Sequence, residues 1–199
     1  MKFDGYQRMM KGAGVALSCR ILIVAVVLGI GTATPAPLWG ASASQIDRDA
    51  TQALNTLYKN NPGAKALADK SVAILVFPSI VKGGFIIAGQ FGDGALRKSG
   101  KSVGYYRSLA ASYGFQAGAQ AFGYVLFFMD DASVRYLDNS DGWEVGTGPS
   151  LVVLDAGFGK NFTTTTLQKG VYAFIFYQKG LMGGVGIQGS KITKIHPNP

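Results

Sequence analysis

The sequence predicts an α+β fold: two N-terminal helices followed by a mostly antiparallel, strongly curved β-sheet or barrel with one short inserted helix. Three observations lead to this class. Apolar residues recur at helical spacing within residues 44–70. At Ser71 the period of the apolar pattern changes from that of a helix to that of a strand. Beyond that point, strand-forming segments alternate with glycine turns almost to the C-terminus, which favours antiparallel pairing.

Residues 1–43 have the order of a secretory signal. A basic stretch precedes ten apolar residues at 21–30, and small residues and prolines then lead to Ala41-Ser42-Ala43, an A-x-A cleavage pattern. The apolar run is short for a membrane-spanning helix, which needs about 20 residues. An uncleaved N-terminal anchor is the alternative. We therefore expect an exported protein, periplasmic or envelope-associated, with a single domain at 44–199.

The charge of residues 44–199, the part expected to be exported, limits the classes of partner that we expect it to bind. Residues 1–43 hold four of the 19 basic and one of the 11 acidic residues, so residues 44–199 carry a formal charge of +5. Cys19, the only cysteine, lies within the expected signal, so no disulfide is predicted. An exported protein seldom meets nucleic acid. Its positive charge therefore favours an anionic lipid surface or another acidic envelope component.

Two helices are predicted at the start of the domain. Apolar residues from Ile46 to Leu57 share one face of the first, and Ser44 with Asp47 resembles a capping box. Pro62 follows a break and occupies a first-turn position, so it starts a second, shorter helix. Both helices end before the change of period.

Strand candidates fill the β-domain expected at 71–195, which we predict to hold about seven to nine strands. One short helix at 132–139, capped by Asp130-Asp131, interrupts them. The apolar run at 170–184 is read as a buried strand, with membrane insertion as the alternative. The strand candidates are 71–77, 84–92, 102–109, 111–129, 143–157, 161–167, 170–178 and 184–195.

Glycine recurs inside three strand candidates, at 88–94, 114–123 and 184–189. Because glycine weakens a strand, its repeated presence predicts tight curvature, or another backbone or ligand at close approach. The last of these segments contains the spacing G-x-G-x-x-G. Only ten residues follow it, too few for the crossover helix of a dinucleotide site, so we do not expect a nucleotide there.

The inventory of reactive side chains argues against catalysis. His196 is the only histidine, and the expected mature chain has no cysteine, so Ser-His and Cys-His catalysis and His-Cys zinc sites are not predicted. Asp130, Asp131 and Asp155 are the carboxylates that an enzyme would use, although helix capping accounts for the first two. We expect a non-enzymatic protein with no cofactor and no metal.

The segment LRKSGKSVGYYR at 96–107 combines basic and tyrosine side chains, a mixture suited to anionic headgroups at a membrane surface. A solvated hairpin is the plainer alternative. The residues predicted to contact lipid are Lys59, Lys65, Lys82, Arg97, Lys98, Lys101, Tyr105 and Arg107.

Four segments, in this order, resemble the SYLF domain, a lipid-binding module also classified as a yeast-type actin-binding domain. The resemblance extends from about Lys65 to Ile195. A segment reading GYYRSLAAS replaces the W-x-x-P of many eukaryotic members, a pattern associated with exported bacterial relatives. The four segments are Ser71-Val72-Ala73-Ile74 with Phe77-Pro78, Lys82-Gly83-Gly84-Phe85 with the glycines of 89–94, Gly114-Phe115-Gln116-Ala117-Gly118-Ala119-Gln120, and Gly180-Leu181 with Gly184 and Gly189.

The resemblance implies a phospholipid-binding domain that uses basic residues and an amphipathic N-terminal segment, without enzymatic chemistry. An actin role is not expected for an exported protein. Our first hypothesis is therefore a lipid-binding protein of the bacterial envelope that contacts anionic phospholipids. The alternative is an envelope scaffold or protein-interaction module for which lipid is incidental. The identity of the lipid and the oligomeric state are left open.

Overall fold

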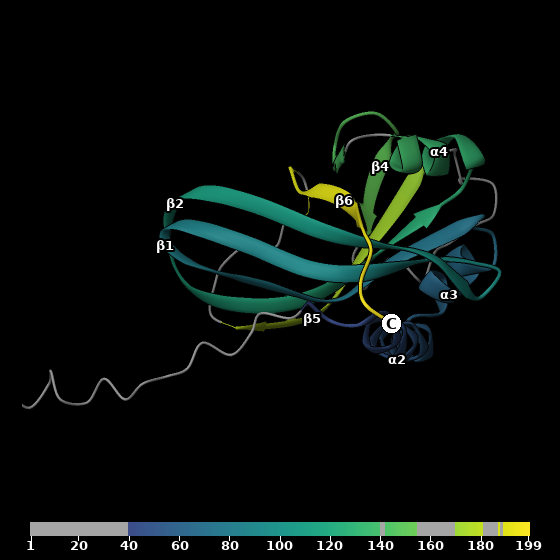
Figure 1. Ribbon diagram of the computed structural model, residues 1–199, viewed down its shortest axis with the longest axis horizontal. Helices are drawn as coiled ribbons and strands as arrows, with labels where there is room; N and C mark the ends of the chain where they lie inside the picture. The colour runs from purple at the N-terminus through teal and green to yellow at the C-terminus, as the bar shows by residue number, and fades with distance from the viewer. Residues whose placement is uncertain (1–39, 140–141, 155–169, 181–186, 188) are drawn as a thin grey trace, which may run out of the picture. The chain divides into compact units, whose positions relative to one another are not determined.

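Residues 40–139, 142–154, 170–180, 187 and 189–199 are described in the computed structural model (Figure 1). Within them lie three helices and six strands. The predicted α+β class, with helices first and a short helix inserted into a curved sheet, is confirmed. In chain order the elements are α2 (Ala43–Asn60), α3 (Pro62–Ala68), β1 (Ala73–Lys98), β2 (Lys101–Phe128), α4 (Asp131–Asn139), β3 (Trp143–Glu144), β4 (Leu151–Leu154), β5 (Val171–Gly180) and β6 (Lys191–Ile195).

The described strands form one mixed sheet around β2. Its order is β3-β6-β2-β5-β4, and β1 pairs with β2 as well. Every pair is antiparallel except β4 with β5, which is parallel. The sheet curls into a half-barrel (Figure 1). In β5, Val171 to Phe174 are buried, which confirms the predicted buried strand for this part of the run, whereas Tyr177 is 43% exposed. The strand predicted at 161–167 lies outside the described residues.

β1 and β2 make one long hairpin, and each of them merges two predicted strands. The turn residues Ser99 and Gly100 have φ values of 49° and 79°, the pair of positive values that a two-residue type I′ turn requires. The pairing shifts register between Phe77 and Ile80 and again after Phe85. Such irregularities bend a strand, which is why the sequence pattern looked like separate short strands.

Glycine allows the two halves of β1 to touch. A Cβ atom on Gly94 would lie 2.4 Å from the carbonyl oxygen of Val76, and one on Gly92 would lie 2.5 Å from that of Ser79. Only a residue without a side chain permits such an approach. The predicted close approach of another backbone at 88–94 is confirmed, whereas 184–189 lies largely outside the described residues.

Apolar side chains form one core on each face of the sheet. The first core includes Phe77, Tyr124 and Trp143, together with Val134 and Leu137 of α4. The second lies between the opposite face of the sheet and the helices α2 and α3. The apolar face of α2, from Ile46 to Leu57, is buried in this second core. The amphipathic N-terminal helix therefore packs its apolar side against the sheet.

The first helix begins slightly earlier than predicted. Ser42, rather than Ser44, is the N-cap, and its hydroxyl accepts a hydrogen bond of 3.2 Å from the backbone N–H of Gln45. The N–H of Ala43 donates to the carbonyl of Asn198 at 2.7 Å. These contacts belong to the compact unit that begins at Gly40. The boundary between residues 43 and 44 stays a prediction.

Asp130 caps α4, as predicted. Its carboxylate accepts hydrogen bonds from the N–H of Ser133 at 2.8 Å and from the N–H of Gly170 at 2.7 Å. Burial alone would raise the pKa of Asp130, but these hydrogen bonds together bring it below its usual value. Asp130 thus joins α4 to the start of β5. Asp155, the third carboxylate considered for catalysis, lies outside the described residues.

Candidate functional site

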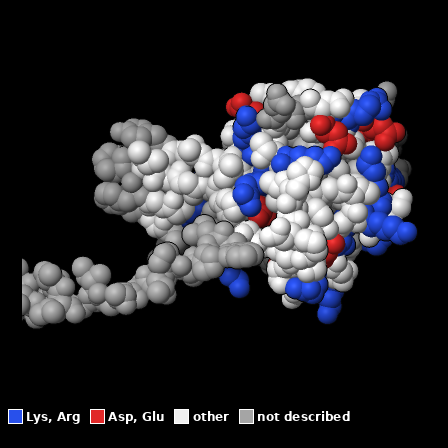
Figure 2. All heavy atoms as spheres, in the orientation of Figure 1, with Lys and Arg blue, Asp and Glu red and all other residues white. Residues whose placement is uncertain are grey.

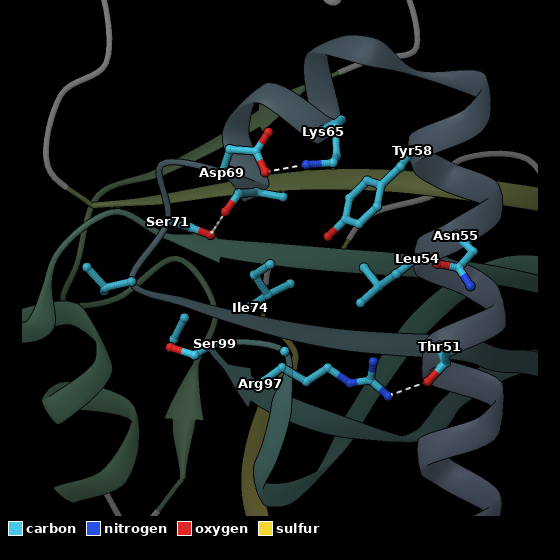
Figure 3. A pocket seen from close by; sticks show the side chains of 14 residues that line it. Thr51, Leu54, Asn55, Tyr58, Lys65, Asp69, Ser71, Ile74, Arg97 and Ser99 are labelled. Carbon is cyan, nitrogen blue, oxygen red and sulfur yellow. Dashed lines mark hydrogen bonds and ion pairs between the residues drawn. The ribbon is translucent and has the colours of Figure 1, made fainter.

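A cleft of about 500 Å³ opens between α2, α3 and the turn of the β1–β2 hairpin (Figure 3). Leu54 and Ile74 supply apolar surface, and both pack in the core beneath the helices. Polar side chains from three elements surround them: Tyr58 from α2, Lys65 from α3 and Arg97 from β1. We call this feature the helix–hairpin cleft. It combines apolar surface with cationic and hydroxyl groups.

Arg97 ties the hairpin to α2 and also lines the cleft. Its Nη2 donates to the carbonyl oxygen of Asp47 at 2.9 Å and to Oγ1 of Thr51 at 2.6 Å. Its Nε is buried and has no hydrogen-bond partner in the described part of the chain. A guanidinium has five N–H donors. Part of the donor capacity of Arg97 is therefore unused.

Asp47 holds the same junction from the side of α2. Its carboxylate accepts hydrogen bonds from the hydroxyl of Ser102 at 2.5 Å and from that of Tyr105 at 2.9 Å. Burial, followed by this hydrogen bond and the charge of Asp47, raises the pKa of Tyr105. The predicted capping box of Ser44 with Asp47 is wrong, because the carboxylate bonds to the hairpin instead.

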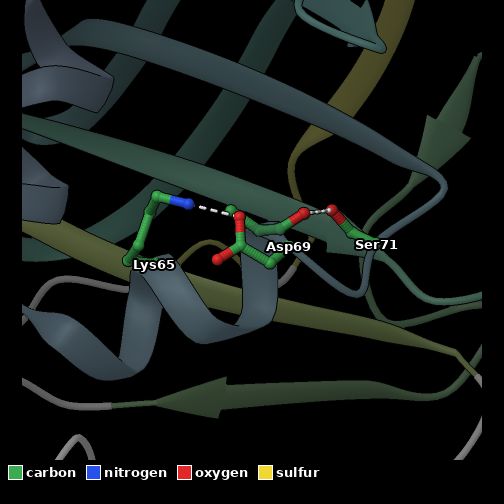
Figure 4. A network of polar contacts seen from close by, with 4 residues as sticks. Lys65, Asp69 and Ser71 are labelled. Atoms are coloured by element: carbon green, nitrogen blue, oxygen red, sulfur yellow. Dashed lines mark hydrogen bonds and ion pairs between the residues drawn. The ribbon is translucent and has the colours of Figure 1, made fainter.

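Lys65 and Asp69 form an ion pair across one turn of α3 (Figure 4). The hydroxyl of Ser71 donates to the carbonyl of Ala68 at 2.8 Å, just after the helix ends. The side chains of Lys65 and Asp69 are 51% and 60% exposed, and solvent-exposed pairs contribute little to stability. Lys65 can therefore exchange Asp69 for another anion at small cost.

Tyr58 stands beside this pair. The Nζ of Lys65 lies 5.9 Å from the centroid of the Tyr58 ring. Burial, with the charge of Asp69 second, raises the pKa of Tyr58 to about 12, although Arg97 acts in the opposite direction. The hydroxyl of Tyr58 is directed into the cleft (Figure 3). It is protonated, and so a hydrogen-bond donor, at neutral pH.

Five of the eight predicted lipid-contact residues lie on the helices α2 and α3 or at the turn of the β1–β2 hairpin, the parts of the fold that border the cleft. Lys65 and Arg97 line it. Lys98 and Lys101 face each other across the hairpin turn, and Lys59 lies in the last turn of α2. Figure 2 shows basic side chains over the part of the domain that carries the helices, whereas the arm formed by the middle of β1 and β2 shows mostly neutral atoms.

The other three predicted residues lie elsewhere. Arg107 forms a two-pronged ion pair with Asp93, with distances of 2.7 Å from Nε and 2.9 Å from Nη2 to the carboxylate oxygens. Its guanidinium also lies 4.8 Å from the ring centroid of Phe91. Tyr105 is engaged by Asp47, and Lys82 lies in the middle of β1. The structure does not bring these three to the cleft.

Sequence reasoning missed Tyr58 and Asp69. One signal could have found Tyr58: it lies four residues after Leu54 on the same helical face, close to the start of the next helix. Asp69 is likewise four residues after Lys65. The pair of Leu54 with Tyr58 and the pair of Lys65 with Asp69 meet around one cleft because of the angle between α2 and α3. The periodicity of the sequence does not predict that angle.

Two further facts concern the described part of the chain as a whole. Among the helices that the structure describes, none has the length and hydropathy needed to cross a membrane. Across the described ranges, no three or more His, Cys, Asp or Glu side chains gather so that they could hold a metal ion.

The domain is thus a strongly curved sheet with two helices on one face and a basic cleft at its hairpin turn. Residues 109–196 match the family model described as Ysc84: Las17-binding protein actin regulator. This match confirms, over residues 109–196, the resemblance to the SYLF family that the sequence indicated. The match includes α4 and β3 to β6, whereas the cleft residues precede it. No curated protein matches the chain.

Proposed function

We propose that this protein is a non-enzymatic lipid-binding protein of the bacterial envelope that contacts anionic phospholipid headgroups through basic residues. The observation that carries the proposal is the helix–hairpin cleft with basic residues on all the elements around it. The match of residues 109–196 to a family associated with lipid and actin binding supports lipid binding in general. Lys59, Lys65, Arg97, Lys98 and Lys101 are the proposed headgroup contacts.

The physical basis is attraction between these residues and a negative membrane surface. A basic residue near such a surface contributes about 1 kcal/mol. The attraction decays over about 10 Å at 0.1 M salt. The apolar face of α2 is occupied by the sheet, so attachment in this conformation relies on side-chain charge rather than on insertion of that helix.

Vesicle co-sedimentation of the purified protein tests this proposal. Vesicles of phosphatidylcholine alone are compared with vesicles that contain phosphatidylglycerol, at low and high salt. The expected result is sedimentation with the anionic vesicles at low salt and release at high salt, because salt screens exposed charges. Equal sedimentation with both kinds of vesicle at low salt would contradict headgroup attraction.

The envelope location rests on the signal-like order of residues 1–43. Residues 1–39 lie outside the described part of the chain. Fractionation of the producing cells, with sequencing of the protein's N-terminus, tests this part separately. We expect the protein in the periplasmic or envelope fraction. A cytoplasmic protein with an intact N-terminus would overturn the location without affecting lipid binding.

A scaffold or interaction module is the second candidate function. It is favoured by exposed apolar side chains on the arm formed by β1 and β2: Val81, Ile87, Phe91 and Leu109 are 44% to 65% exposed. Phe91 and Leu109 face each other across the two strands. Native mass measurement and pull-down from envelope extract distinguish the candidates. A stable protein complex from a protein that ignores anionic vesicles would favour the scaffold.

A further inference from the structure

The guanidinium of Arg97 holds a donor that no described residue satisfies. Its Nη2 is engaged with α2, but its buried Nε lacks a partner among the described residues. A buried donor without an acceptor is unfavourable. An acceptor that enters the cleft and pairs with this guanidinium would relieve that cost. Planar guanidinium groups pair especially well with phosphate and carboxylate oxygens.

Two further donors stand on the helical wall of the same cleft. The hydroxyl of Tyr58 points into it and makes no hydrogen bond to any described residue. Among the described residues, the ion-pair partner of Lys65 is Asp69, and because this pair is exposed an incoming anion can displace or share it. The three donors come from α2, α3 and β1, so they approach a central acceptor from different directions.

The cleft also has the size and the charge for a small anion with a short apolar part. Arg97 and Lys65 together outweigh Asp69, so its lining is net positive. Its volume of about 500 Å³ falls within the 300–1,000 Å³ or so typical of small-molecule sites. Leu54 and Ile74 offer apolar surface to a glycerol or methylene group. A tetrahedral phosphate ester fits this arrangement, because its several oxygens accept from several directions.

We propose that the helix–hairpin cleft binds one phosphate ester group in a 1:1 complex, held by Arg97, Lys65 and Tyr58. This inference rests on the proposed function for the expectation that the ester belongs to a lipid. The recognition chemistry itself is the same for a phospholipid headgroup and for a soluble phosphate ester. All three residues precede the segment that matches the family model.

Calorimetric titration of the full protein with three soluble probes tests the site. The probes are inorganic phosphate, glycerol 3-phosphate and dihexanoyl phosphatidic acid below its micelle concentration. We expect saturable 1:1 binding of the two esters. Tyr58→Phe keeps the ring and removes the hydroxyl, and Lys65→Gln removes the charge. Each is expected to weaken ester binding about tenfold to a hundredfold, the loss of one hydrogen bond to a charged group.

Matched controls separate the site from general effects. Tyr136→Phe, on α4, and Lys179→Gln, on β5, change exposed residues of the same types outside the cleft. Both are expected to bind the esters like the unchanged protein. Circular dichroism checks that each variant is folded. Ester binding that is unaffected by Tyr58→Phe and by Lys65→Gln in folded protein overturns the proposal.

The probes and vesicles together distinguish failure of the cleft from failure of the proposed function. Equal affinity for the two esters identifies the phosphate as the recognised group. Tighter binding of dihexanoyl phosphatidic acid shows that the cleft also contacts the glycerol ester part of the lipid. Both results support the cleft. Binding to anionic vesicles without saturable binding of any probe overturns the cleft and leaves the lipid function standing. Ester binding without vesicle binding overturns the proposed lipid function and leaves the cleft standing.

Discussion

The guanidinium of Arg97 lies 2.6 Å from the hydroxyl of Thr51, a residue 46 positions earlier in the chain. This hydrogen bond fastens the tip of the β1–β2 hairpin to the middle of α2. It closes one side of the helix–hairpin cleft, and Nε of the same guanidinium finds no acceptor among the described residues. Arg97 therefore has two roles: it holds the fold together, and it supplies an unsatisfied donor at the site.

Replacing Arg97 should destabilise the protein. Arg97→Lys retains the charge but cannot contact Asp47 and Thr51 through one planar group. We expect the free energy of unfolding to fall by about 1–2 kcal/mol, measured by urea denaturation. The matched variant is Lys98→Gln, the next residue, which should change it by less than about 0.5 kcal/mol. Equal stability of the two variants would contradict the role of the Arg97 hydrogen bonds.

The N-cap of α2 gives a paired test on two nearby serines. Ser42→Ala removes the hydroxyl that caps the helix, so it should lower the free energy of unfolding by about 1 kcal/mol. Ser44→Ala should have a much smaller effect, because Ser44 lies inside the helix. Thermal or urea unfolding of both variants measures the difference. A larger loss with Ser44→Ala would instead restore the capping box predicted from sequence.

Stability should fall at alkaline pH. Burial is the largest cause that raises the pKa of Tyr58, Tyr106 and Tyr124 above the ordinary value of 10.0. Above pH 10 the unfolded chain therefore loses these protons first, so the free energy of unfolding decreases as pH rises. For Tyr58 the loss should extend from about pH 10 to about pH 12. Urea unfolding measured across this pH range should show that the free energy of unfolding of Tyr58→Phe decreases less steeply with pH than that of the unchanged protein.

Arg107 should affect stability rather than membrane attachment. The carboxylate of Asp93 is only 8% exposed, so Arg107→Gln leaves a buried charge without its partner and should cost about 1–3 kcal/mol. Asp93→Asn together with Arg107→Gln should recover part of this loss in a double-mutant cycle. Vesicle binding by folded Arg107→Gln should match that of the unchanged protein. A selective loss of vesicle binding would return Arg107 to the contact surface.

The helices and the strand-forming segments could be predicted because their signals are local. The spacing of Ile46, Ala50 and Leu54 alone indicates the buried face of α2. Asp130 alone predicts the N-cap of α4. The merging of the strands into β1 and β2 could not be predicted. It depends on the bends and on the register along the hairpin, where pairing extends from Lys98 with Lys101 to Ala73 with Phe128.

The cleft was predictable only in part. The basic residues around the hairpin turn are visible as a cluster in the sequence, but their partners are not. Asp47 meets Ser102 and Tyr105 across more than 50 positions, and no local pattern reports such a contact. For the same reason, Arg107 looked available for lipid although Asp93 pairs with it from the neighbouring strand.

Vesicle binding by two charge-matched double variants tests the central claim most directly. Lys98→Gln with Lys101→Gln removes two charges beside the cleft, and Lys179→Gln with Lys191→Gln removes two exposed charges on β5 and β6. The account predicts that the first variant binds anionic vesicles at least about tenfold more weakly, while the second binds like the unchanged protein. Equal losses in the two variants would contradict attachment at the helix–hairpin cleft.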